Sequence, residues 1–461
     1  MEMQLSEIAN VVGAQNDVSA WQNVNITSVA FDTRKLQPGA LFVPLNGERD
    51  GHEFIKQAQV AGAVASFWQV DHGECPINMP ILVVNDTLKA LQKLAQYYLL
   101  MKVNPKVVAV TGSNGKTTTK DMIAAVLSTQ FNVHKTQDNF NNEIGVPMTI
   151  LSMKTNTEIL VVEMGMDRPG QLDFLSKLVQ PDIAVITMIG EAHIEFFGTR
   201  DKIADAKMEI THGLKEDGLL VYNGDEPLLN ERVKNLKVDL KRFGSNHDND
   251  LYPEQIDAMS DHTTFKLNKW PDLTFSIPMM GAYNVYNALA AILVGRRFHI
   301  KPEKIQAALA NFQVTKNRTQ WLTGAQGERI LSDVYNSNPT ALKAVLRNFG
   351  RVNVTDNGHR IAVLGDMLEL GDASAKLHAS IVDSLDPTVI NEVYLYGDEM
   401  QVLADRLKDK YPTGTVHYYP FGQQEELIAA LQHDLTKNDI IMLKGSHGMH
   451  LENVLAMLQT N

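Results

Sequence analysis

The middle of the chain alternates short, continuously apolar runs with longer stretches that mix apolar and polar residues. The apolar runs are KVVAVTG, EILVVEMG, PDIAVITMIG and DGLLVYNGDE, which begin at residues 106, 158, 181 and 217. A strand that is buried on both faces reads as an uninterrupted apolar run, whereas a half-exposed strand alternates. Four such runs separated by helix-length segments therefore predict a mainly parallel sheet with helices on both faces.

Similar alternation occurs on either side of this middle block. ALFVPL, AGAVASFW and PILVVND precede it, and RIAVLGDM, EVYLYGD and DIIMLKGS follow it. Asn104-Pro105 is a boundary signal, because the residue before a proline is biased away from helix. We expect an α/β protein of three domains, at residues 1–100, 101–313 and 314–461.

Composition fits this division. The chain has 461 residues, 44% hydrophobic and 21% charged, as is usual for a soluble globular protein. A net charge of −12 argues against broad binding to nucleic acid or anionic membranes. One cysteine, Cys75, excludes an intrachain disulfide and a multi-cysteine metal site. The N-terminus lacks a signal-peptide pattern, and no run is long enough to span a membrane, which predicts a cytoplasmic protein.

TGSNGKTTT, at residues 111–119, follows the first apolar run and precedes an amphipathic stretch. Glycine lets backbone N–H groups approach an oxyanion, Lys116 offers a charge to phosphate, and Thr117 offers a hydroxyl to Mg²⁺. Val110 stands where the longer phosphate-loop pattern has another glycine, so only G-x-x-G-K-T remains. The agreement of strand, turn, lysine, threonine and helix favours a nucleotide site over a chance turn. Its residues are Gly112, Ser113, Asn114, Gly115, Lys116, Thr117 and Thr118.

Two later runs end in groups that could hold a second cation. Glu163 closes one run, and His193 lies in the loop after another. Ligands of open α/β sheets bind beyond the carboxyl ends of the strands, where both groups are expected. Taken alone, each is more often an ordinary loop residue, and their position relative to the phosphate loop makes the two interpretations about even. Lys202 and Lys207 lie on a predicted helix, where composition indicates only a solvated face.

Together with TGSNGKTTTK, several motifs resemble the Mur ligase family, ATP-dependent amide-forming enzymes of peptidoglycan synthesis. These are SVAFDTRKLQPGALFVPLNGERDGHEF, NFNNEIGVP, EMGM, AHIEFFG, DAKMEI, GAYNVYNALAA, DVYNSNPTA, LGDMLELG and LKGSHGMHLE. The resemblance implies an N-terminal UDP-substrate domain, a central phosphate-loop ATPase domain and a Rossmann-like C-terminal domain. It also implies ATP and Mg²⁺ as cofactors, and addition of D-alanyl-D-alanine to a UDP-N-acetylmuramoyl-tripeptide through an acyl phosphate.

The same resemblance implies roles for individual residues. Lys116, His193 and Lys207 would be catalytic, and Lys207 would be carbamylated so that it binds Mg²⁺ with Thr117, Glu163 and His193. Beyond the phosphate loop, Asn284, Asn287, Arg318 and Asp333 would contact ATP. The UDP-substrate would meet Asp32, Thr33, Arg34, Asn139, Asn141 and Asn142. The dipeptide side would include Asn336, Asn338, Gly365 and Asp366.

The residues taken by themselves leave other interpretations open. Asn284 and Asn287 also fit a helix cap with an exposed amide. Arg318 also fits a charged linker residue, and Asp32–Arg34 also fit a solvated turn. His447 stands where the family commonly has arginine, so a contact to a substrate carboxylate there would be weaker at neutral pH. The alternatives are a tripeptide-forming Mur ligase, a folylpolyglutamate synthase or a phosphate-loop switch. DVYNSNPTA and LGDMLELG favour the dipeptide-adding ligase.

The expected mechanism brings two anions together, so Lys116, Arg318 and metal ions must neutralise charge. We expect the C-terminal domain to close over the middle domain and exclude water from the acyl phosphate. The expected partners are small-molecule substrates, with no nucleic acid and no membrane insertion, and the protein is expected to be a monomer. The patterns do not decide between diaminopimelate and lysine as the third residue of the acceptor.

Overall fold

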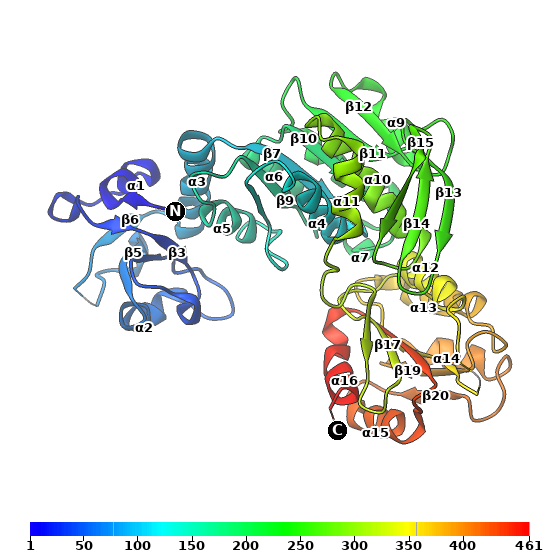
Figure 1. The fold of residues 1–461 in the computed structure, drawn as a ribbon. Helices are drawn as coiled ribbons and strands as arrows, with labels where there is room; N and C mark the ends of the chain where they lie inside the picture. Colours follow the sequence, from blue (N-terminus) through cyan, green and yellow to red (C-terminus); the bar gives the residue numbers. More distant parts are fainter. Residues whose placement is uncertain (77, 356, 461) are drawn as a thin grey trace.

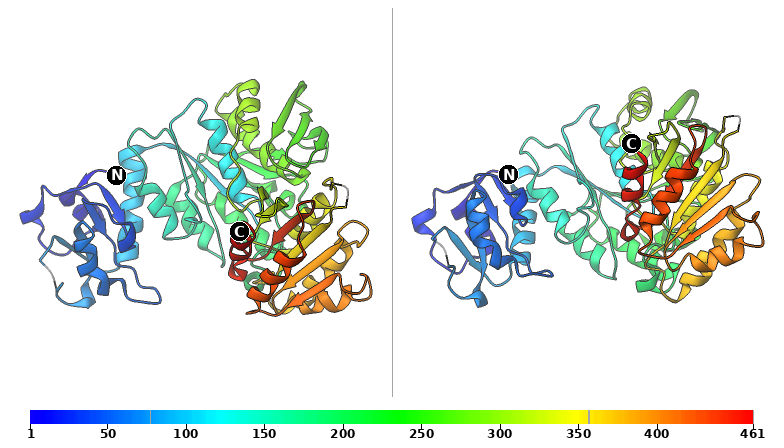
Figure 2. Two further views of the ribbon diagram at one scale, coloured as in Figure 1. Left: turned by 60° about the horizontal axis from the view of Figure 1, so that its bottom comes forward. Right: turned by 90° about the horizontal axis from the view of Figure 1, so that it is seen from below.

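The computed structural model describes residues 1–76, 78–355 and 357–460 and contains three main sheets along the chain (Figure 1). The predicted α/β class with a mainly parallel middle sheet is confirmed. Views from two further directions show the N-terminal lobe projecting from one side, whereas the C-terminal sheet lies beside the middle one (Figure 2). Among the described residues, no helix is long and apolar enough to cross a membrane.

The N-terminal lobe is built on a four-stranded parallel sheet in the order β3-β4-β5-β6. A short antiparallel pair, β1 with β2, lies beside it. The strands are β1 (Met3–Gln4), β2 (Asn25–Ile26), β3 (Ser28–Ala30), β4 (Ala40–Phe42), β5 (Ala63–Gln69) and β6 (Ile81–Val84), and the helices are α1 (Leu5–Val12), α2 (Ile55–Val60) and α3 (Thr87–Tyr97).

The middle sheet has six parallel strands in the order β12-β11-β10-β7-β9-β8. Its strands are β7 (Lys106–Thr111), β8 (Val133–Lys135), β9 (Ile159–Glu163), β10 (Ile183–Ile186), β11 (Leu219–Asn223) and β12 (Asp239–Phe243). Its helices are α4 (Lys116–Leu127), α5 (Gly145–Leu151), α6 (Gln171–Val179), α7 (Ile194–Phe197), α8 (Arg200–Met208), α9 (Pro227–Arg232), α10 (Ala282–Arg297) and α11 (Pro302–Ala310). The chain passes from β7 to one side of the sheet and then returns to the other side, so β7 marks the switch point where such folds bind ligands.

A three-stranded antiparallel sheet, which the apolar runs did not indicate, covers part of the middle region. It contains β13 (Pro253–Ala258), β14 (Thr263–Leu267) and β15 (Trp270–Ile277). Its buried side chains, such as Phe265 and Phe275, share a core with Val108 and Val110 of β7 and with α10. This sheet therefore supports α4 and α10 on one face of the middle sheet.

The opposite face of the middle sheet shares one continuous core with the N-terminal lobe. Ala109 and Leu160 of the sheet belong to the same cluster as Leu91 of α3, Ile150 of α5 and Phe67 of β5. Because side chains of a strand alternate between faces, Val108 and Ala109 enter different cores. The first two sheets are thus joined through apolar packing.

The C-terminal sheet also has six strands, in the order β16-β17-β21-β18-β19-β20, and all pairs except the antiparallel β16 and β17 are parallel. The strands are β16 (Gln320–Thr323), β17 (Arg329–Asp333), β18 (Arg360–Gly365), β19 (Glu392–Tyr396), β20 (Val416–Tyr419) and β21 (Ile440–Lys444). The helices are α12 (Pro339–Phe349), α13 (Ser374–Ala379), α14 (Gln401–Leu407), α15 (Gln424–Asp434) and α16 (Leu451–Leu458). Buried apolar residues lie on both faces of this sheet.

Candidate active site

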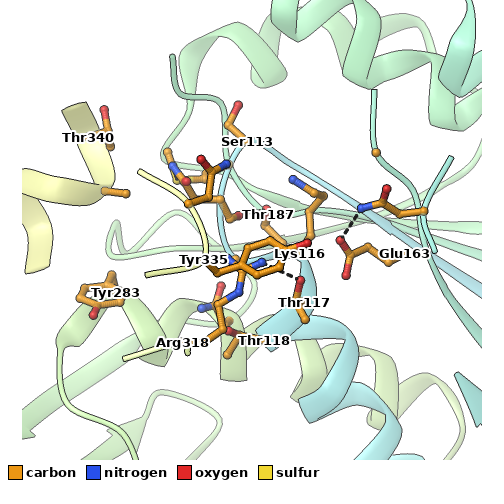
Figure 3. A pocket seen from close by; sticks show the side chains of 18 of the residues that line it. Ser113, Lys116, Thr117, Thr118, Glu163, Thr187, Tyr283, Arg318, Tyr335 and Thr340 are labelled. Atoms are coloured by element: carbon orange, nitrogen blue, oxygen red, sulfur yellow. Dashed lines mark hydrogen bonds between the residues drawn. The ribbon is translucent and has the colours of Figure 1, made fainter. Parts of the chain in front are cut away.

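A cavity of about 440 Å³ lies where the carboxyl ends of the middle strands meet the C-terminal part (Figure 3). Residues that follow β7, β9, β10 and β17 line it, together with the start of α10. The cavity brings together many of the residues expected at the site: Ser113, Asn114, Gly115, Lys116, Thr117, Thr118, Asn139, Asn141, Asn142, Glu163, His193, Asn284, Asn287, Arg318, Asp333 and Asn336.

The phosphate loop has the backbone that its glycines predict. Gly112 has φ 151° and Gly115 has φ 80°, and a Cβ on Gly112 would lie 1.8 Å from Oγ1 of Thr187. That hydroxyl donates a 2.6 Å hydrogen bond to the carbonyl of Asn114. One loop carbonyl is therefore paired with a protein hydroxyl, next to the start of the 12-residue helix α4, whose N-terminus favours anions.

Lys116 folds back over its own loop and donates a 2.8 Å hydrogen bond to the carbonyl of Gly112. Desolvation lowers the pKa of Lys116, the Glu163 carboxylate opposes that shift, and Arg318 adds to it. A polyphosphate in the cavity would be an anionic partner for Lys116 and would favour the charged form of its amine.

Two contacts link the phosphate loop to the C-terminal part. Nη2 of Arg318 donates a 3.2 Å hydrogen bond to Oγ1 of Thr117. Asn338 and Asn114 form a reciprocal amide pair, in which Nδ2 of Asn338 lies 2.6 Å from Oδ1 of Asn114 and the return bond is 3.3 Å. The two parts are thus in direct contact at the loop that would bind phosphate.

Glu163 has the features of a cation ligand. It lies opposite Val110 of β7 and is 2% exposed. Asn141 donates a 2.9 Å hydrogen bond to Oε1, but among the described residues Oε2 is buried without a hydrogen-bond partner. A buried carboxylate oxygen needs a partner, and Mg²⁺ prefers carboxylate and hydroxyl oxygens, so Glu163 and Thr117 fit a magnesium ion.

His193 directly precedes α7, has a left-handed backbone with φ 64°, and lines the cavity. Its Nδ1 lies 2.5 Å from Oε2 of Glu369, which comes from the C-terminal part. Glu369 also has a left-handed backbone, φ 61°. Two strained residues from different parts of the chain therefore meet beside the cavity.

Lys207 is buried, unlike the exposed Lys202 on the same helix, so the solvated helix face predicted from composition is wrong for Lys207. In the described part of the chain its amine has neither a hydrogen-bond nor an ion-pair partner. Burial, and then the charge of Lys116, hold the pKa of Lys207 well below its ordinary value. A neutral, reactive amine is what carbamate formation requires, although the modification itself stays a prediction.

The asparagines at the start of α10 are held by the protein. Asn284 donates to the carbonyl of Met280, Asn287 donates to Oδ1 of Asn284, and Thr119 donates to Oδ1 of Asn287. Asp333 accepts a 2.6 Å hydrogen bond from the buried Lys444. These groups are fixed in place at the cavity wall.

Other residues that were expected at the site lie outside the cavity lining. Arg34 is highly exposed and forms a salt bridge with Asp32 in its own turn, next to Thr33. Lys35 of the same turn lies 5.4 Å from the ring centroid of Phe140, so this turn approaches the loop that carries Asn139 and Asn142.

Gly365 and Asp366 are buried at the end of β18. The Asp366 carboxylate accepts hydrogen bonds from the backbone N–H groups of Glu399 and Met400, and burial raises its pKa to about 6.

Several cavity residues had no signal in the sequence. Tyr335 and Thr340 lie within the motif DVYNSNPTA, and Lys444 lies within LKGSHGMHLE. No spacing rule distinguishes these three residues from their neighbours in the motifs. Thr187 ends an apolar strand in the same way as many structural threonines. Only the fold brings these side chains next to the phosphate loop.

The fold and the cavity define a nucleotide-binding enzyme with three α/β parts. Residues 25–99 match the Mur ligase family catalytic domain, residues 110–295 the Mur ligase middle domain, and residues 317–447 the Mur ligase glutamate ligase domain. The chain belongs to the Mur ligase family.

Curated relatives narrow this class. The chain is 42% identical to UDP-N-acetylmuramoyl-tripeptide–D-alanyl-D-alanine ligase of Bacillus subtilis, with 98% of this chain and 97% of that protein covered. It is 31% identical to the enzyme of the same name from Escherichia coli, with 100% and 99% covered.

Solved structures agree with these relatives. A crystal structure of MurF from Acinetobacter baumannii superposes with a TM-score of 0.86 at 27% identity, covering 100% of this chain and 99% of that one. MurF from Thermotoga maritima in complex with ADP gives a TM-score of 0.80 at 29% identity, covering 94% and 97%.

Proposed function

We propose that the protein is an ATP-dependent ligase that joins D-alanyl-D-alanine to a UDP-N-acetylmuramoyl-tripeptide. The products are the UDP-linked pentapeptide, ADP and phosphate. The observation that carries the proposal is the contact of Arg318 with Thr117 above a glycine-rich phosphate loop, beside the buried Glu163 carboxylate with its unpartnered oxygen. Full-length similarity to relatives named for this reaction supports the choice of substrates.

The reaction begins when the terminal carboxylate of the tripeptide attacks the γ-phosphorus of ATP, and the bond from that phosphorus to the ADP oxygen breaks. Two anions must approach each other, so Lys116 and Arg318 supply positive charge to the transferred phosphoryl group. The amine of the dipeptide then attacks the acyl carbon, loses a proton and expels phosphate. This transfer between bound reactants depends on positioning by the protein and requires no covalent intermediate with it.

Magnesium, when bound, neutralises charge on the phosphates. Thr117, Glu163 and His193 are the residues proposed to hold it, together with Lys207 after carbamylation. The neutral Lys207 amine can add to CO₂ and release a proton, which leaves a carbamate anion on a long side chain. The low pKa of this buried amine supports that step.

The remaining assignments belong to the same proposal. The adenosine is assigned to Asn284, Asn287 and Asp333. The UDP-sugar is assigned to Asp32, Thr33, Arg34, Asn139, Asn141 and Asn142. The dipeptide side is assigned to Asn336, Asn338, Gly365 and Asp366. The cation–π contact of Lys35 with Phe140 supports a common surface for the two UDP-sugar segments. We propose a monomer that works in the cytoplasm on small-molecule substrates.

ADP release by the purified protein tests the proposal, with ATP, Mg²⁺ and the two substrates added singly and together. We expect turnover only with both substrates, and a product heavier by the dehydrated dipeptide. Turnover without either substrate would contradict a ligase. Turnover with a UDP-N-acetylmuramoyl-dipeptide and a single amino acid would keep the family and contradict the substrates. Acceptors ending in diaminopimelate and in lysine, compared side by side, identify the third residue.

A further inference from the structure

Arg318 is held by an aromatic ring at the point where it reaches the phosphate loop. Its guanidinium carbon lies 3.8 Å from the ring centroid of Tyr335, while Nη2 donates to Thr117. Figure 3 shows Tyr335, Arg318 and Thr117 close together at the cavity. A guanidinium that lies on an aromatic face keeps a fixed plane, and the ring attracts its charge.

The backbone around Arg318 is unusual. Asn317 and Thr319, the residues before and after it, both have left-handed conformations, with φ 60° and 49°. Thr319 is held from two sides, because its N–H donates to Asp333 and its hydroxyl contacts the hydroxyl of Tyr283. Strain of this kind persists where the surroundings fix it, and it concentrates at functional sites.

Arg318 keeps its charge available. Within the described residues it has no salt bridge, and its side chain has only the Thr117 hydroxyl and the Tyr335 ring as partners. A carboxylate would also orient the guanidinium, but it would cancel the charge that a phosphoryl group needs. An aromatic ring orients the guanidinium without neutralising it.

We propose that Tyr335 is a positioning residue for Arg318, which it holds in the plane that faces the transferred phosphoryl group. The proposal rests on the proposed ligase function. The ring of Tyr335 has a second aromatic contact, since His447 packs against it in a T-shaped arrangement, at 5.8 Å between centroids with an interplanar angle of 87°. The role belongs to the ring, so the hydroxyl of Tyr335 is dispensable for it.

Substitutions at Tyr335 separate the ring from the hydroxyl. Y335F keeps the stacked ring and is expected to retain kcat within about twofold of the wild type. Y335L removes the ring and is expected to lower kcat about tenfold, as loss of a partly desolvated cation–π contact would do. The KM for D-alanyl-D-alanine and the calorimetric Kd for ADP are expected to stay within about threefold, because the contact acts on the chemical step.

A double-mutant cycle tests whether Tyr335 acts through Arg318. In an R318A background, Y335L is expected to change kcat less than about twofold, measured as ADP release from radiolabelled ATP. W270L is the matched control. Trp270 also stacks with an arginine, Arg296 at 5.7 Å, but does not line the cavity, so kcat is expected to be unchanged.

Three results would overturn the positioning role. They are equal loss in Y335F and Y335L, a tenfold effect of Y335L that persists without Arg318, or a loss confined to KM. Thermal unfolding checks each variant, and Y335M replaces Y335L if the latter does not fold. If the turnover of R318A cannot be distinguished from that of a reaction without enzyme, the comparison of Y335F with Y335L alone tests the positioning role. Absence of turnover in the wild type with both substrates contradicts the ligase function, and is thereby distinguished from failure of the positioning role.

Discussion

The two walls of the cavity are built in different ways. The wall from the middle sheet carries its phosphate loop on one continuous segment, in which β7, the glycine turn and α4 follow each other along the chain. The C-terminal wall gathers its side chains from three segments, which carry Arg318, Asp333 with Tyr335, and Lys444. A continuous segment binds phosphate through backbone N–H groups that its own glycines orient. A gathered wall supplies side chains whose position depends on how the two parts of the protein meet.

The largest expected effect concerns the continuous wall. K116M should lower turnover at least about 10³-fold, because it removes the charge closest to the transferred phosphate. The measurement is ADP release at saturating ATP and substrates. K202M, on the exposed face of α8, serves as the control and should match the wild type. Comparable activity of K116M and K202M would contradict the assignment of the loop.

Substitution of Glu163, in the same wall, should lower activity and raise stability. E163Q keeps an acceptor for Asn141 but removes the buried charge, so the Mg²⁺ concentration for half-maximal turnover should rise and kcat should fall on the order of 10²-fold. Without ligands, the Tm of E163Q should rise by about 2 °C, since a buried carboxylate with one unpartnered oxygen is lost.

E158Q, at the exposed opposite end of β9, is the matched control for E163Q and should leave the Mg²⁺ dependence unchanged. A Tm that falls in E163Q, together with an unchanged Mg²⁺ dependence, would mean that Glu163 has only a structural role.

Asn338 sharpens the comparison, because it follows Tyr335 and Asn336 of the gathered wall along the chain and also caps α12. Its Oδ1 accepts the N–H of Ala341, and its amide pairs with Asn114. N338D should keep the cap and lose about tenfold in kcat/KM. N338A should lose both functions, with a cost in unfolding free energy of about 1 kcal/mol.

Denaturant unfolding and steady-state kinetics separate the two roles of Asn338. N348A, near the other end of α12, is the control and should preserve kcat/KM. The idea that the amide pair matters fails if N338D retains full activity.

Asp366 should give the smallest effect on turnover, and its clearest effect on the pH dependence of stability. Its pKa is about 6 in the folded protein and near 3.8 in the unfolded chain. Between these pH values the folded state binds more protons than the unfolded chain. The stability that the protonated Asp366 carboxyl contributes is therefore full below about pH 4 and is lost as the pH rises to 6. D366N should flatten this part of the profile of unfolding free energy against pH. D372N, which is exposed, should leave the slope as in the wild type; a slope that D366N also leaves unchanged would exclude Asp366 as its source.

The same contrast explains what the sequence could predict. The parallel middle sheet and the phosphate loop follow from local rules, since apolar runs, glycines and a lysine each carry a physical meaning at short range. Glu163 and His193 could be placed because strand ends converge. Tyr335 and Lys444 could not, because their roles arise from packing between strands distant along the chain. Lys207 shows where local patterns mislead. Its helix pattern indicates exposure, and only tertiary packing buries it.

The core shared by the N-terminal lobe and the middle sheet bears on how the chain could be recombined with its relatives. A chimera joined near residue 100 would combine two halves of a single core, with Leu91 and Ile150 facing side chains from another protein. A junction at residues 313–319 would leave that core intact. It would place foreign residues at the polar contacts around Asn114 and Thr117, and around Met280, which packs into the C-terminal core. The C-terminal sheet is therefore the part that could be exchanged between family members with the least repacking.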